Sequence, residues 1–213
     1  MAPPLDQLLT PAHTALVTQE CQNGVLGEPA TFPAFAEAAR ATMVPNVARL
    51  AVAARAAGVQ VVHCVFERRP DGRGSSSNAK VFAVAARSPV ALTPGTPAVE
   101  VIPEVGLAPE DLVLTRFHGV GPMAGTDLDP VLRNLGVRTI VAVGVSVNVG
   151  LTNLVLDAVN AGYQVVVPRD AVAGIPPEYA DAVIDNTLSW VATITTTDEV
   201  VATWSQQSDG ADG

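Results

Sequence analysis

The sequence lacks most features of a secreted, membrane-spanning or metal-binding protein. Its two cysteines, Cys21 and Cys64, have neither the number nor the spacing of a disulfide framework or a zinc site. No run of about 18 apolar residues is free of Pro, Gly and charge, so we expect no transmembrane helix. No basic segment precedes the first apolar residues, so we expect no secretory signal. These absences predict a cytoplasmic protein.

Basic residues are scarce relative to acidic ones. Twelve Lys and Arg stand against 21 Asp and Glu, which gives a formal net charge of −9. So acidic a chain argues against nucleic acid or an anionic membrane as a partner. Hydrophobic residues are abundant at 48%, and 213 residues suffice to bury a sizeable core. We predict one domain over residues 1–207, followed by a disordered tail at 208–213.

Short apolar runs alternate with helical patterns along the chain. The patterns predict strands at 14–20, 59–67, 111–117, 138–144, 163–170 and 193–197, and helices at 44–58, 79–88, 127–136, 148–162, 177–192 and 198–207. Apolar strands that alternate with helices are typical of a parallel sheet covered on both faces. We therefore predict an α/β fold, a three-layer α/β/α sandwich around a six-stranded, mainly parallel Rossmann-like sheet.

Ligands of such sheets bind at the carboxyl ends of the strands, so the charged residues there are candidates for a site. Glu20 closes the first strand, where a carboxyl group in an apolar setting can act as a general acid or base; the alternative is a carboxylate that caps the next turn. Arg116 closes the third strand, where a guanidinium can pair with Glu20 or hold a substrate carboxylate; the alternative is a purely structural ion pair.

Two loops supply further candidates. His118 lies in a glycine-containing loop after the third strand, where an imidazole can exchange protons or simply be a surface residue. The polar loop at 68–78 includes Arg68 and Arg73, which could grip an anionic substrate as a lid or lie in solvent. His63, which alternates with apolar residues inside the second strand, is expected to be a core histidine.

The turn GVSVNVGLTN, residues 144–153, joins the fourth strand to a helix and has no strong nucleophile, acid or base before Leu151. With its surroundings it resembles the isochorismatase-like hydrolase superfamily, which includes nicotinamidases, N-carbamoylsarcosine amidohydrolases and isochorismatases. The resemblance runs from about Ala15 to Thr197 and is strongest over 125–174, from a Gly-Thr helix start through the Asn-Val turn to a closing Asp-Ala. It implies a parallel α/β/α fold, a small-molecule substrate and a homo-oligomer, either a dimer or a tetramer.

The catalytic trio of that superfamily is Asp, Lys and Cys, and the resemblance carries it onto three changed residues. The Asp of the Asp-x-Gln pattern falls on Glu20, the Lys falls on or beside Arg116, and the nucleophilic Cys falls on Gly150. The Asp-x-His pattern of zinc-containing members reads Glu67-Arg68-Arg69 here, so we predict no metal, and we predict no other cofactor.

The resemblance also implies a cis peptide bond between Val145 and Ser146. The backbone of Ser146, Val149 and Gly150 would then bind the substrate as an oxyanion hole does. Isochorismatases share Gly at the cysteine position and cleave a vinyl ether by protonation, without a covalent intermediate.

Three functional hypotheses follow. The first is a hydrolase of a small anionic molecule that uses Glu20, with Arg116 and His118, for non-covalent acid/base catalysis. The second is a catalytically inactive binding or regulatory homologue on the same fold. The third has Ser146 or a cysteine as the nucleophile.

Overall fold

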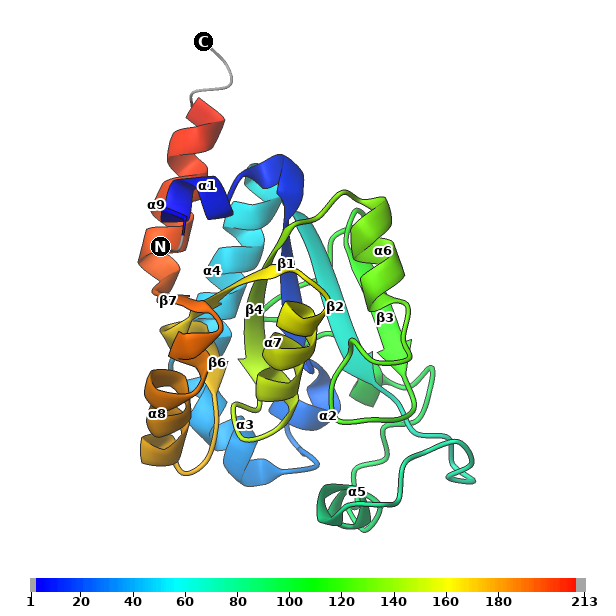
Figure 1. Ribbon diagram of the computed structural model, residues 1–213. Helices are drawn as coiled ribbons and strands as arrows, with labels where there is room; N and C mark the ends of the chain where they lie inside the picture. The colour runs from blue at the N-terminus through cyan, green and yellow to red at the C-terminus, as the bar shows by residue number, and fades with distance from the viewer. Residues whose placement is uncertain (1–2, 210–213) are drawn as a thin grey trace.

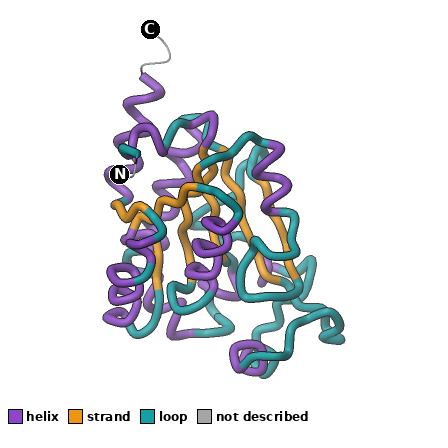
Figure 2. Tube along the Cα trace, in the orientation of Figure 1, coloured by secondary structure: helices purple, strands orange, loops and turns teal. Residues whose placement is uncertain are grey.

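A computed structural model describes residues 3–209 as one sheet with helices on both of its faces (Figures 1 and 2). The strands are β1 (Thr14–Gln19), β2 (Gln60–Phe66), β3 (Leu112–Arg116), β4 (Thr139–Val145), β5 (Gln164–Pro168), β6 (Val172–Ala173) and β7 (Thr193–Thr195). Their order is β3-β2-β1-β4-β5-β7, with β6 paired to β4, and all of these pairs are parallel. The predicted fold class and its six strands are confirmed, with one short strand added.

The helices that the periodicity predicts are also present. They are α4 (Met43–Ala56), α5 (Lys80–Ala85), α6 (Leu128–Asn134), α7 (Gly150–Asn160), α8 (Pro177–Asn186) and α9 (Thr197–Asp209). The predicted helix at 177–192 is interrupted after Asn186, and a 3-10 turn, Leu188–Trp190, follows. Helix α9 extends to Asp209, so residues 208 and 209 of the predicted tail are helical, whereas 210–213 lie outside the described residues.

Three further helices were not predicted. They are α1 (Leu5–Leu8), α2 (Asn23–Leu26) and α3 (Pro33–Arg40). The first two have four residues each, too few for a periodic pattern to register. Helix α3 begins with Pro33 in its first turn, a position that proline favours, but the Gly- and Pro-rich sequence before it is typical of a loop.

The sheet separates two apolar cores. Helices α1 to α4 and α9 cover one face, where Leu50 and Trp204 are fully buried. Helices α6, α7 and α8 cover the other, around Leu128, Leu154 and Ile184. Strand β1 is buried at every position because β2 and β4 flank it and helices cover both faces. Such a layered core holds the strand ends in fixed relative positions.

The two ends of the described chain lie side by side, away from the carboxyl ends of the strands (Figure 1). The indole nitrogen of Trp204 in α9 donates to the carbonyl oxygen of Leu9 at 3.1 Å, and Gln207 donates to that of Asp6 at 2.7 Å. Within residues 3–209, no helix combines the length and apolar character needed to cross a membrane.

Candidate active site

The ends of β1 and β3 meet in a partly buried ion pair. Arg116, the last residue of β3, donates from Nη2 to Oε1 of Glu20, which directly follows β1. The Arg116 side chain is 3% exposed and that of Glu20 is 23% exposed. The guanidinium also lies over the ring of Phe66, 5.3 Å from its centroid, at the end of the intervening strand β2. The strand-end residues that the sequence singles out are thus brought together.

Glu20 is held by its backbone as well as by Arg116. Its φ of +54° makes it the one non-glycine residue with a left-handed backbone in the part of the chain that the structure describes. Gln19 donates from Nε2 to Oε1 of Glu20 at 2.8 Å, so this oxygen accepts two hydrogen bonds. Among residues 3–209, no donor contacts Oε2, which leaves that oxygen available to a ligand.

The guanidinium of Arg116 has unused hydrogen-bonding capacity. Its Nε and Nη1 atoms are buried and have no acceptor among the described residues. Buried donors normally have a partner, and an unpaired one in a cleft needs an explanation. An acceptor on a bound molecule is one such partner.

The turn between β4 and α7 lies beside this ion pair. The Val145–Ser146 peptide bond is cis, as the resemblance implies. Ser146 is half-buried, Val149 is 41% exposed, and Gly150 is the buried first residue of α7. In the described chain, the amides of Ser146 and Gly150 donate to no protein acceptor, whereas the predicted donor at Val149 is already used, because its amide donates to the carbonyl oxygen of Ser146 at 3.1 Å. This turn therefore presents backbone donors next to Glu20 and Arg116.

The fully buried Gln19 explains why a glycine suits position 150. A Cβ atom built on Gly150 would lie 3.0 Å from Nε2 of Gln19 and 3.2 Å from the carbonyl oxygen of Val120. Both distances are shorter than ordinary van der Waals contact. The Gln19 amide thus occupies the space that a side chain at 150 would need.

A single cavity of about 120 Å³ joins these groups. Glu20 and Arg116 are its charged lining residues, and Thr31 and Ser146 contribute hydroxyl groups. The rest of the lining is glycine or apolar, and includes Phe32, Phe35, Phe66, Phe82, Val25, Val81, Ala85, Leu92, Gly119, Val120, Val145, Val149 and Gly150. The cavity is a largely apolar chamber with a charged end.

The other predicted site residues lie outside this chamber. His118 is exposed and absent from the lining, and its imidazole lies near Gly125 in the same loop. Arg68 lines an adjoining depression that shares Phe66 with the cavity, whereas Arg73 is exposed. The loop at 68–78 reaches the site through Ser76, whose hydroxyl accepts from the amide of Gly119 at 3.0 Å.

The cysteines and His63 are structural. Burial raises the pKa of Cys21 and of Cys64 to about 12, so neither thiol is ionised near neutral pH. His63 is fully buried between Thr18, 2.9 Å away, and Asp111, 3.3 Å away, which confirms it as a core histidine. Within residues 3–209, no cluster of His, Cys, Asp or Glu is arranged to hold a metal ion.

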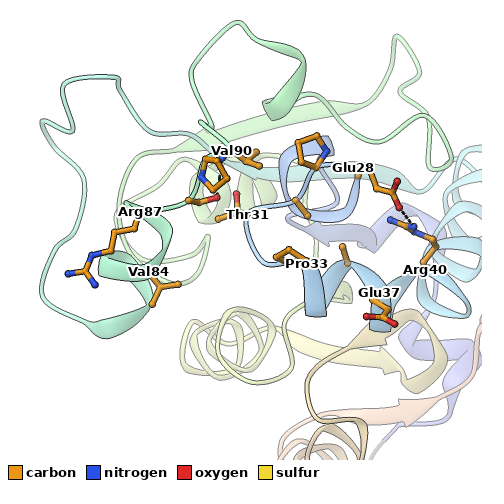
Figure 3. Close-up of a pocket in the computed structure, with 14 residues that line it drawn as sticks. Glu28, Thr31, Pro33, Glu37, Arg40, Val84, Arg87 and Val90 are labelled. Atoms are coloured by element: carbon orange, nitrogen blue, oxygen red, sulfur yellow. Dashed lines mark hydrogen bonds and ion pairs between the residues drawn. The ribbon is translucent and has the colours of Figure 1, made fainter.

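A second hollow lies on the other side of α5. This open groove of about 810 Å³ runs between α3 and the segment around α5, with Thr31 shared between groove and cavity (Figure 3). Figure 3 shows Val84 of α5 at one end and the exposed ion pair of Glu28 and Arg40 at the other. None of the strand-end residues lines it, so we place the chemistry in the smaller cavity.

Several residues of the site carry no signal in the sequence. Gln19 reads as an ordinary strand residue, and the four cavity phenylalanines lie on three separate segments of the chain. Only the local pattern of α5, in which Val81, Phe82 and Ala85 share one helical face, marks an apolar surface.

Comparison with known proteins gives a consistent result. The family model for the isochorismatase domain matches residues 14–199. Ureidoacrylate amidohydrolase RutB of Rhizobium rhizogenes is 29% identical over 207 residues, which cover 87% of this chain and 82% of that protein.

Solved structures agree in fold along nearly the whole chain. A cysteine hydrolase from Pseudomonas syringae superposes with a TM-score of 0.82 at 26% identity, covering 97% of this chain and all of the other. An isochorismatase family protein from Desulfovibrio vulgaris gives a TM-score of 0.77 at 28% identity, covering 89% of this chain and 98% of the other.

Proposed function

Because the chain belongs to the isochorismatase family, we propose that it is a hydrolase that acts on a small anionic molecule by non-covalent acid/base catalysis at Glu20. The observation that carries this proposal is the Glu20–Arg116 ion pair at the charged end of an otherwise apolar cavity. Neither cysteine nor a side chain at position 150 supplies a nucleophile there.

Arg116 would bind the substrate. Its unpaired Nε and Nη1 donors and its permanent charge suit a carboxylate or carbonyl oxygen. The ion pair with Glu20 is neutral overall, so a bound carboxylate would add a second negative charge beside that of Glu20. As a general acid, Glu20 would enter the reaction in its protonated form.

That proton would give Glu20 its catalytic role. Oε2 of Glu20 would protonate the leaving atom as its bond to the substrate carbon breaks, a water molecule would add to the cationic carbon left behind, and the water's surplus proton would return to Oε2. One water is consumed, one bond is cleaved, and Glu20 ends as it began. The amides of Ser146 and Gly150 would stabilise charge that develops on the substrate oxygen.

A catalytically inactive, ligand-binding homologue is the alternative. The mainly apolar lining and the absence of a thiol at position 150 favour it, since both are compatible with binding alone. We also propose that the protein forms a homo-oligomer, which light scattering of the purified chain would test.

Turnover by a Glu20→Gln variant separates catalysis from binding. The parent protein and the variant are assayed against enol ethers, amides and lactams, with Glu104→Gln, an exposed residue outside the cavity, as the matched control. General acid/base catalysis contributes roughly 10²–10⁴ in rate, so we expect a loss of that size in Glu20→Gln and none in the control. Retained turnover in Glu20→Gln would rule out the carboxyl as the acid. Ligand binding by a parent protein with no turnover on any substrate would favour the alternative.

A further inference from the structure

The phenylalanines of this protein are concentrated at the cavity. The chain has five phenylalanines, and four of them line this one chamber. Phe32 and Phe35 come from the start of α3, Phe66 ends β2, and Phe82 lies on α5. All four are only half-buried, so apolar ring surface remains for a ligand to cover.

The rings are arranged around the cavity from two sides. Phe32 and Phe35 pack edge to face, with centroids 5.9 Å apart, and Phe66 supports the guanidinium of Arg116. These three belong to elements anchored in the body of the protein. Phe82 belongs to α5, in which no residue is fully buried.

Helix α5 is the least anchored wall of the cavity. It lies between two long loops at the end of the molecule where β2 and β3 terminate (Figures 1 and 2). Val81, Phe82 and Ala85 line the cavity, whereas Val84 lines the groove on the other side. The helix therefore lies between the two hollows, with Phe82 on its cavity side.

The size of the cavity limits what can fit beneath α5. An apolar protein cavity of about 150 Å³ binds benzene, and this one is about 120 Å³ with an open mouth. Its charged groups, Glu20 and Arg116, form an ion pair at the strand ends, so a ligand can place a polar head there and must fill the remainder with apolar surface.

We propose that Phe82 on α5 is the specificity-determining residue of this site: it admits substrates whose body is apolar and no larger than one six-membered ring. The proposal rests on the proposed function only for the position of the site and of the polar head at Arg116. It adds that the aromatic ring on α5 makes the substrate choice, and that Arg68 and Arg73, which do not line the cavity, have no part in it.

Equilibrium binding tests this without requiring turnover. Dissociation constants are measured for the full-length protein by calorimetric titration with acetate, butyrate, benzoate and 2-naphthoate. We expect benzoate to bind roughly tenfold or more tighter than butyrate, because it buries more apolar surface, and 2-naphthoate to bind more weakly than benzoate. Equal affinity for acetate and benzoate, or no binding by any member of the series, would overturn the proposal.

Variants of α5 then assign the selection to Phe82. Phe82→Ala should weaken benzoate and favour 2-naphthoate, reversing their order, whereas Phe82→Leu should give an intermediate result. Val84→Ala, on the opposite side of the same helix, is the matched control and should leave the series unchanged. Circular dichroism confirms that each variant is folded. If Phe82→Ala leaves the order of the benzoate and 2-naphthoate dissociation constants unchanged, or if Val84→Ala changes it in the same way, Phe82 does not determine ligand specificity.

This design keeps the two proposals distinguishable. If the parent protein hydrolyses no substrate but the series behaves as expected, the role of Phe82 stands and catalysis by Glu20 fails. If Glu20→Gln abolishes a real turnover but Phe82→Ala leaves the ligand order unchanged, the catalytic proposal stands and the selectivity proposal fails.

Discussion

Substituting Gly150 with alanine tests the geometry at the centre of the site. Position 150 begins α7, where alanine is normally favoured over glycine by up to about 1 kcal/mol. At this position, however, the structure predicts that alanine lowers the free energy of unfolding. The new Cβ would lie 3.0 Å from Nε2 of Gln19, and this fully buried amide must move by a few tenths of an ångström or more.

The decrease in the free energy of unfolding can be worked out from the hydrogen bond that Gln19 would lose and from the crowding by the new methyl group. Its hydrogen bond to the Glu20 carboxylate, 2.8 Å long, is of the charged kind that contributes about 1.5–3 kcal/mol. Overpacking a core by one methyl group costs about 1–3 kcal/mol by itself. After the gain in helix propensity, we expect Gly150→Ala to lower the free energy of unfolding by about 2 kcal/mol, or Tm by roughly 4–8 °C.

Urea denaturation of a double-mutant cycle provides the assay. The Gln19→Ala variant removes the obstructing amide, so adding Gly150→Ala to it should cost about 1–2 kcal/mol less than it does in the parent protein. A Gly150→Ala variant as stable as the parent, or a double variant in which the two effects simply add, would refute the claim that Gln19 fills the space beside position 150.

The remaining predictions concern buried polar groups. The Arg55–Asp111 ion pair is buried at Asp111, so Arg55→Met should lower the free energy of unfolding by about 3–5 kcal/mol in urea titrations; a loss below 1 kcal/mol would contradict this. Burial lowers the pKa of His63, so below about pH 6.5 the unfolded chain binds more protons than the folded one, and the free energy of unfolding should decrease as pH falls. A His63→Asn variant should show a shallower decrease in urea titrations at several pH values. The same pH profile in the variant and the parent protein would contradict this prediction. Because burial raises the pKa of Cys21 and Cys64 to about 12, a thiol reagent should modify them at pH 8 only after urea unfolds the chain, as absorbance would record; fast labelling of folded protein would contradict this.

The sequence predicts the sheet and the charged end of the site well, for physical reasons. The inner strands β1, β2, β4 and β5 are buried at nearly every position and are therefore rich in apolar residues, which makes them stand out. The strand-end rule places Glu20 and Arg116 together although 96 positions separate them. Position 150 follows from the same topology, because α7 begins where β4 ends.

The walls of the cavity are less predictable because no local pattern encodes them. The cavity phenylalanines come from three elements, and only the packing of α3 and α5 beyond the strand ends brings their rings together. The loop at 68–78 shows the opposite case, a conspicuous sequence whose two candidate residues do not line the cavity. Its arginines are conspicuous in an acidic chain, yet Arg73 is exposed and Arg68 lines only an adjoining depression.

The left-handed backbone of Glu20 has a consequence for how this protein can change over evolutionary time. A left-handed backbone costs an L-residue about 1–2 kcal/mol because its Cβ atom crowds the following carbonyl oxygen, whereas glycine, which has no Cβ, pays almost none. A related protein that no longer needs the carboxyl group would therefore gain stability by replacing residue 20 with glycine, provided that its partner Arg116 is replaced as well. The residue found at position 20 in related chains should accordingly record whether each of them is still under selection for its chemistry.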